Sequence, residues 1–223
     1  YLREDEIPME LKNKKINFLG DSITEGWGTT SVDKCFVSLI ASEYGAVCRN
    51  YGVGGTRMTW EYTPDGKVIG KDFCSRAVQM DTDADAVIIL GGTNDFHGEV
   101  PIGRMTDTTP VSFYGAWNTL CTYLTEKYLG KPIVIMTPLH RCNEDNPRGE
   151  DKPCDVRNFK AYINVIREIA EYYSFPLLDL YAQSGIQPRI PLVKETYMPD
   201  GLHPNDAGHA LLAQKIASFL KSI

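Results

Sequence analysis

The stretch DAVIIL, residues 85–90, decides the fold. Five consecutive apolar residues follow the aspartate, and three of them are β-branched. A continuous apolar run of this length is typical of a strand covered on both faces, as strands of parallel sheets are. The stretch therefore predicts a buried strand inside a parallel sheet, with helices packed on either side.

Further short apolar runs predict more strands, and longer amphipathic runs between them predict helices. The predicted strands are 16–20, 46–52, 85–90, 132–138 and 176–180, and the predicted helices are 33–44, 110–130, 155–174 and 205–223. Gly130 is expected to end the second helix, and Asn205 or Asp206 to cap the last. A strand followed by a helix, repeated along the chain, predicts an α/β fold with a parallel sheet between helices.

The chain is expected to form one domain over residues 1–223, with residues 1–14 as an N-terminal extension. We find no repeat, low-complexity tract or linker in the 223 residues. Two stretches, 54–72 and 91–109, are long and irregular, and loops of such length in a compact α/β domain are often functional.

Composition and charge exclude several classes of partner. The net charge of −6 disfavours a nucleic acid, which usually requires a basic face. No apolar run approaches the ~20 residues that span a bilayer, so no membrane partner is expected. The cysteines form no C-x-x-C pair and no metal-ligand spacing occurs, so neither a metal nor a cofactor is expected.

Cysteine usage and the N-terminal residues favour a cytoplasmic protein. The polar opening YLREDEIPME lacks the features of a signal peptide, although removal of one before Tyr1 stays open. Cys142 and Cys154 flank one polar loop, and the sequence leaves open whether they pair.

The stretch FLGDSITEGWG, residues 18–28, has two interpretations. Ser22-x-x-Glu25 fits a capping box at a helix start, and the stretch taken alone favours this reading. The alternative is that the Ser22 hydroxyl lies at the end of a strand and attacks a substrate.

The carboxyl ends of the predicted strands favour the second interpretation, because open α/β sheets bind ligands beyond these ends. The polar or flexible residues that follow the strands are Ser22, Gly54, Gly55, Asn94, Asp200 and His203. This convergence favours a catalytic Ser22, which could still assist in capping.

These residues suit acyl transfer. His203 can take the proton of Ser22, because imidazole titrates near neutral pH. Asp200, three residues earlier, can bind the other ring nitrogen and stabilise the imidazolium. The backbone N–H groups of Ser22 and Gly55 and the side-chain amide of Asn94 can donate to the oxyanion that forms.

The same residues resemble the SGNH, or GDSL-like, hydrolase family. Its motif blocks occur in family order as G-D-S at 20–22, N-Y-G-V-G-G at 50–55, G-x-N-D at 92–95 and D-x-x-H at 200–203. The family's oxyanion glycine aligns best with Gly55, with Gly54 as the alternative. Ile23 replaces the leucine of the literal GDSL string, a change between two aliphatic residues.

The resemblance implies a flavodoxin-like, three-layer α/β/α sandwich with a parallel five-stranded sheet and metal-independent ester hydrolysis. It assigns Ser22, His203 and Asp200 to the catalytic triad, and the Ser22 amide, Gly55 and Asn94 to the oxyanion hole. The family's substrates range over lipids, thioesters, simple esters and acetylated sugars, so the resemblance does not name the substrate.

We expect a short acyl group such as acetyl on a small or carbohydrate substrate. No long apolar lid is present to shelter a fatty chain, and loops 97–109 and 141–155 are polar. The alternatives are a lipase or thioesterase with longer acyl substrates and a non-catalytic carbohydrate-binding module. The candidate pocket residues are Asp21, Trp27, Arg57, Thr93, Asp95 and Phe96. Structural roles are expected for His97, His140 and His209, and the oligomeric state stays open.

Overall fold

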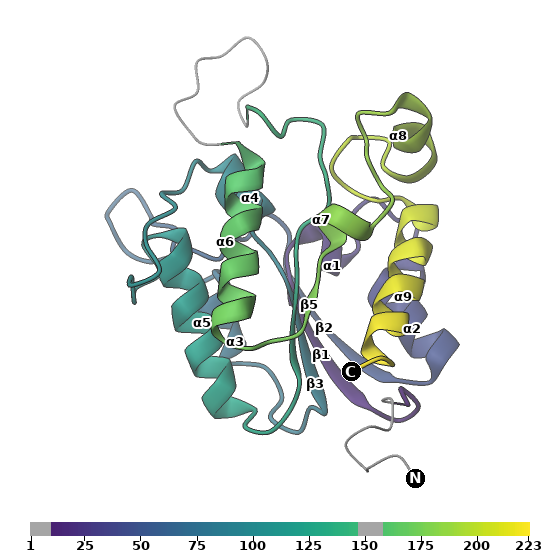
Figure 1. The fold of residues 1–223 in the computed structure, drawn as a ribbon, viewed down its shortest axis with the longest axis horizontal. Helices are drawn as coiled ribbons and strands as arrows, with labels where there is room; N and C mark the ends of the chain where they lie inside the picture. The colour runs from purple at the N-terminus through teal and green to yellow at the C-terminus, as the bar shows by residue number, and fades with distance from the viewer. Residues whose placement is uncertain (1–9, 147–157) are drawn as a thin grey trace.

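The computed structural model describes residues 10–146 and 158–223 of the chain. Its centre is a single parallel sheet of five strands in the order β2-β1-β3-β4-β5 (Figure 1). The strands are β1 (Lys15–Gly20), β2 (Val47–Gly52), β3 (Ala86–Leu90), β4 (Ile133–Met136) and β5 (Leu177–Leu178). The predicted parallel sheet is confirmed, and all five predicted strands are present with small shifts at their ends.

Helices cover both faces of this sheet. The helices are α1 (Ser22–Glu25), α2 (Phe36–Tyr44), α3 (Phe73–Ala77), α4 (Thr93–His97), α5 (Phe113–Lys127), α6 (Phe159–Tyr172), α7 (Leu180–Gln183), α8 (Pro191–Tyr197) and α9 (Asp206–Leu220), with a 3₁₀ turn, η2, at Val32–Lys34. Helices α3, α5 and α6 lie on one face, and α2 and α9 on the other (Figure 1). The expected three-layer α/β/α sandwich is confirmed.

Strand β3 shows why the sheet requires two helical layers. Val87 and Ile89 pack in the core with α5 and α6, whereas Ile88 and Leu90 pack in the core with α2 and α9. Alternate residues of a strand point to opposite faces, so a strand that is apolar at every position needs cover on both. Each aliphatic side chain that is fully buried contributes ~1.5–3 kcal/mol.

Several short helices were not predicted, because helices of four to seven residues are too short to show a clear helical periodicity. Helix α4 falls inside the stretch 91–109, which was expected to be irregular, and the prediction was wrong there. Helices α1, α3, α7 and α8 are likewise additions to the predicted set. The predicted helix 155–174 is found as α6, with residues 155–157 outside the described residues.

The ends of the helices and of the chain refine the prediction further. Asn205, not Asp206, caps α9, and its side chain accepts a hydrogen bond from Gly208 N at 3.1 Å. Leu11 is buried with α2 and α9, although it was expected in an extension over residues 1–14. Residues 1–9 lie outside the described residues.

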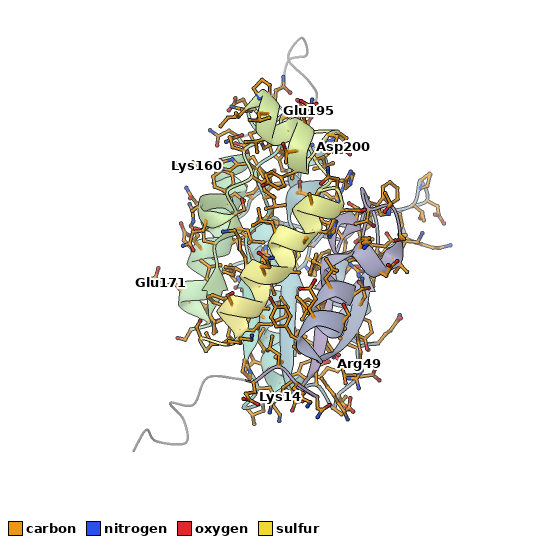
Figure 2. All side chains as sticks on the ribbon, turned by 90° about the vertical axis from the view of Figure 1, so that its right-hand side faces the viewer. Lys14, Arg49, Lys160, Glu171, Glu195 and Asp200 are labelled. Carbon is orange, nitrogen blue, oxygen red and sulfur yellow. The ribbon has the colours of Figure 1, made fainter. Side chains whose placement is uncertain are left out.

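Glycines at the ends of β1 and β2 allow α1 to pack directly on the sheet. A Cβ on Gly20 would lie 1.9 Å from Thr24 Oγ1, and one on Gly52 would lie 2.2 Å from Glu25 N. Only glycine permits such close backbone approach. Ser22 is thereby held at the carboxyl end of β1. Asp200 lies near α8, at the end of the molecule opposite Lys14 (Figure 2).

Among the described residues, no helix is both long enough and apolar enough to cross a membrane.

Candidate active site

Helix α1 presents Ser22 to a histidine rather than using it as a cap. Asp21 is the N-cap residue, and its Oδ1 accepts from Ile23 N at 3.0 Å. Ser22 Oγ lies 3.0 Å from Nε2 of His203. The capping-box interpretation of Ser22 is therefore wrong, because Asp21 is the N-cap residue and Ser22 is the first residue of the helix. Ser22 is only 5% exposed.

In the turn between α8 and α9, His203 is hydrogen-bonded to Asp200 through its ring and its backbone. Asp200 Oδ2 lies 2.7 Å from His203 Nδ1, while Oδ1 accepts from the backbone N–H groups of Leu202 and His203 at 2.8 and 2.7 Å. An ionised carboxylate can only accept, so Nδ1 carries the proton and Nε2 is left to accept the Ser22 hydroxyl. This tautomer follows from the network of partners.

The same hydrogen bonds keep Asp200 ionised. Partial burial alone would raise its pKa, but the bonds from the backbone and ring of His203 outweigh burial and lower the pKa below its ordinary value. The carboxylate is therefore charged at neutral pH and can stabilise a protonated His203.

In the turn after β2, the backbone N–H groups of Gly54 and Gly55, the two candidate oxyanion donors, differ in their hydrogen bonding. Gly54 N–H donates to Glu25 Oε2 at 2.6 Å. Within residues 10–146 and 158–223, no hydrogen-bond partner of Gly55 N–H is found. Gly55 has φ of +73°, and the space where a Cβ would stand is open. The backbone of Gly55 can therefore approach a bound group closely.

Asn94 lies at the start of α4 and reaches the same turn. Its Nδ2 donates one hydrogen to Thr56 O at 2.9 Å. An amide nitrogen carries two hydrogens, so this bond fixes the side chain and leaves a second donor. Gly55 N–H and the second hydrogen of Asn94 Nδ2 therefore have no partner among the described residues.

Arg76, on α3, binds the ends of β1 and β2 and the turn that carries Gly55, a role that was not predicted from the sequence. Its NH2 group donates to Gly20 O at 3.0 Å and to Thr56 Oγ1 at 2.9 Å, and NH1 donates to Tyr51 O. One planar guanidinium can bind several acceptors at fixed angles. Burial lowers the pKa of Arg76 to about 10, so it keeps its charge at neutral pH.

The family model for GDSL-like lipases and acylhydrolases matches residues 18–211, which include every residue of this arrangement. The chain belongs to the GDSL-like lipase/acylhydrolase family. It is therefore a hydrolase that acts on ester bonds. The motif blocks on which the sequence resemblance rests occur in that matched range.

Solved structures share the fold over nearly the whole chain. One is 34% identical with a TM-score of 0.84, and the match covers 96% of this chain and 99% of the other. A protein from Lactobacillus plantarum is 27% identical with a TM-score of 0.81, covering 95% and 98%. An acetylxylan esterase from Geobacillus stearothermophilus shares the fold at 22% identity with a TM-score of 0.63, covering 95% and 96%. No curated protein matches the chain.

Two of the predicted pocket residues of this GDSL-like hydrolase are accessible. Trp27 is 55% exposed, and its ring centroid lies 5.7 Å from that of His203. Arg57 is partly exposed and pairs with Glu61 at 3.5 Å. Its guanidinium packs against Gly98, where a Cβ would lie 2.3 Å from Cζ.

Asp95 and Phe96 were predicted to line the pocket, and this prediction was wrong because both are fully buried. Asp95 accepts from Met58 N and from the backbone and hydroxyl of Thr59 at 2.9–3.1 Å. Burial raises its pKa in spite of these bonds. Asp95 therefore attaches the segment after β2 to α4, and Phe96 packs against Phe159.

Asp21 and Thr93 were also predicted to line the pocket and are also buried. Thr93 accepts from the guanidinium of Arg141 through both its carbonyl and its hydroxyl oxygen, at 3.1 and 3.0 Å. Burial raises the pKa of Asp21 to about 6, against the opposing effects of its bond from Ile23 and the charge of His203.

Two of the other histidines, His209 and His140, have partners that suit structural roles. His209 Nδ1 accepts from Phe36 N at 3.1 Å, and His140 Nδ1 lies 2.5 Å from Glu144 Oε1. Burial and the neighbouring arginines lower the pKa of His97. In the described part of the chain, no three His, Cys, Asp or Glu side chains are grouped so that they could hold a metal ion.

Cys142 is a free thiol whose Sγ lies 3.6 Å from Pro188 O. Its candidate partner, Cys154, lies outside the described residues.

Proposed function

We propose that this protein is a serine esterase that removes a short acyl group, such as acetyl, from a small or carbohydrate ester. The observation that carries the proposal is the chain of hydrogen bonds from Ser22 Oγ to His203 Nε2 at 3.0 Å and from His203 Nδ1 to Asp200 Oδ2 at 2.7 Å. These distances permit a proton to pass from the nucleophile to its base.

The reaction has two halves. Ser22 Oγ attacks the carbonyl carbon while His203 Nε2 takes the hydroxyl proton. His203 then gives that proton to the leaving alcohol oxygen as the ester bond breaks, and an acyl group remains on Ser22. Water, deprotonated by His203, attacks this acyl group. The bond from the acyl carbon to Ser22 Oγ then breaks, His203 returns the proton to Oγ, and the carboxylic acid leaves. Asp200 stays ionised throughout and stabilises the imidazolium in both halves.

The oxyanion of each tetrahedral intermediate would be bound by the N–H groups of Ser22 and Gly55 and by the Asn94 amide. Gly54 is a poorer candidate because Glu25 already occupies its N–H group. The bond from Asn94 to Thr56 O and the bonds from Arg76 to Gly20 O and Thr56 Oγ1 support the donors in advance of substrate. Donors held in place contribute most to such catalysis, each about 100–1000-fold in rate.

The choice of a short acyl group rests on the loops around the site. Loop 97–109 is largely polar, and so is the described part of the second loop, 141–146. A long acyl chain would require an apolar channel to cover it.

The proposal is tested by steady-state kinetics with p-nitrophenyl esters from acetate to palmitate, together with an acetylated xylo-oligosaccharide. We expect acetate to give the highest kcat/KM and the Ser22→Ala variant to lose at least ~10⁴-fold in kcat while remaining folded. A preference for long acyl chains would replace the proposal with a lipase. A folded wild-type protein that binds the sugar but hydrolyses no ester would indicate a carbohydrate-binding module.

A further inference from the structure

Trp27 combines high exposure with a fixed position. More than half of its surface is exposed, and tryptophan is enriched where proteins bind partners because it offers a large apolar face beside a polar N–H group. The indole is nevertheless held, since Nε1 donates to Glu25 Oε2 at 2.9 Å. Its backbone N–H also donates to Ser22 O at 2.9 Å.

Glu25 holds this indole and the glycine turn with one oxygen atom. Oε2 accepts both from Trp27 Nε1 and from Gly54 N, the latter at 2.6 Å. The indole lies directly over Gly54, where a Cβ would stand 3.1 Å from Cε2 and Nε1. A larger residue at this position would therefore push the indole and the Glu25 carboxylate away from the turn that precedes Gly55.

The position of Trp27 relative to His203 indicates which half of an ester it meets. In the proposed reaction His203 protonates the leaving alcohol, so the alcohol half must lie beside the imidazole. The Trp27 ring centroid is 5.7 Å from the His203 ring, with an interplanar angle of 39°. The indole thus lies next to the imidazole that protonates the alcohol half in the proposed reaction.

We infer that the exposed face of Trp27 binds the sugar ring of an acetylated carbohydrate by stacking, and that Glu25 is the positioning residue that holds this face. The inference rests on the proposed esterase function. A pyranose ring has faces of C–H groups, which bury apolar area against a flat aromatic ring, and its hydroxyl groups can remain in water. The rigid indole loses little conformational entropy when the sugar binds.

The test measures hydrolysis in a pH-stat, without an aromatic leaving group that could itself stack on the indole. Wild type, Trp27→Ala and Trp27→Phe are compared on an acetylated xylo-oligosaccharide, ethyl acetate and ethyl butyrate. We expect Trp27→Ala to lower the ratio of kcat/KM for the sugar ester to that for ethyl acetate by about tenfold, mainly through KM. Trp27→Phe should recover part of this loss.

Two controls separate stacking from general damage. Tyr172→Ala removes another exposed aromatic side chain, on α6 and 66% exposed, and should leave the ratio unchanged. Glu25→Ala should lower the sugar ratio as Trp27→Ala does and should also reduce kcat on ethyl acetate, because it releases the Gly54 turn. A Glu25→Ala protein with the sugar ratio of the wild type would contradict the positioning role.

A binding readout avoids turnover. In the Ser22→Ala background, the acetylated xylo-oligosaccharide should change tryptophan fluorescence, and the additional Trp27→Phe change should remove most of that signal.

The outcomes distinguish this inference from the proposed function. If the wild type hydrolyses both acetates and Trp27→Ala keeps their ratio, the stacking inference is wrong and the esterase stands. If Trp27→Ala instead changes the ratio of ethyl butyrate to ethyl acetate, Trp27 contacts the acyl half and the inference is also wrong. If the wild type hydrolyses none of the esters, the proposed function fails.

Discussion

Asp21 and Ser22 are neighbours in the chain but have different environments. Asp21 is buried and caps α1, whereas Ser22 Oγ meets His203. The sequence pattern Ser22-x-x-Glu25 suggested Ser22 as the N-cap residue, one position after the actual N-cap, Asp21. Aspartate is as good an N-cap as serine, so the pattern alone could not decide between the two. Glu25 instead accepts from Trp27, two residues later, and from Gly54 in the turn after β2, which packs on α1.

Asn94 allows the proposed oxyanion hole to be tested at the residue scale. Asn94→Ala removes one donor while Ser22, His203 and Asp200 keep their mutual bonds. We expect kcat for the preferred acetate ester to fall ~100–1000-fold, with a much smaller change in KM, because the donor acts mainly in the transition state. Circular dichroism and thermal unfolding check that the variant is folded. A loss below about threefold would remove Asn94 from the oxyanion hole.

At the scale of elements, the strands were predictable and the short helices were not. Strand β3 is apolar at every position, and this pattern predicts a buried strand whatever its tertiary contacts are. Helices α3 and α4 have five residues each, and their positions depend on contacts distant in sequence, such as Asp95 to Met58 and Thr59. Asp95 and Phe96 were misassigned to the pocket for this reason.

Helices α2 and α9 are joined through His209, and this contact should be sensitive to acid. Burial lowers the pKa of His209 from 6.5 to about 4. The unfolded chain therefore binds more protons than the folded one between these values, so the free energy of unfolding falls as the pH falls from about 6.5 to about 4. The loss attributable to His209 is up to about 3 kcal/mol.

His209→Asn isolates this contribution. Asparagine can still accept from Phe36 N but does not titrate. It loses the stacking of the imidazole on the Phe36 ring, so the variant should be less stable than wild type at pH 7. That difference in the free energy of unfolding should shrink as the pH is lowered toward 4, measured by urea denaturation at several pH values. A difference independent of pH would contradict the buried neutral imidazole.

At the scale of the whole molecule, the parallel topology assembles residues that are far apart in the chain. Ser22 follows β1, Gly55 follows β2 and Asn94 follows β3, and these three strands are neighbours in the sheet. This convergence was predictable because parallel strands end at one edge. The support from Arg76 was not predictable, because its acceptors, Gly20, Tyr51 and Thr56, are mostly backbone atoms with no sequence signal.

The central claim is that Ser22 is a nucleophile activated by His203 and oriented through Asp200. The most direct measurement is covalent labelling by a fluorophosphonate, followed by mass spectrometry of the labelled peptide. The claim predicts one label, on Ser22, which is absent from Ser22→Ala. Labelling should be at least ~10³-fold slower in His203→Ala. Asp200→Ala should fall between this variant and wild type, because the Asp200 side chain is 54% exposed and water can replace part of its role. Equal labelling of Ser22→Ala, or a label on another residue, would contradict the claim.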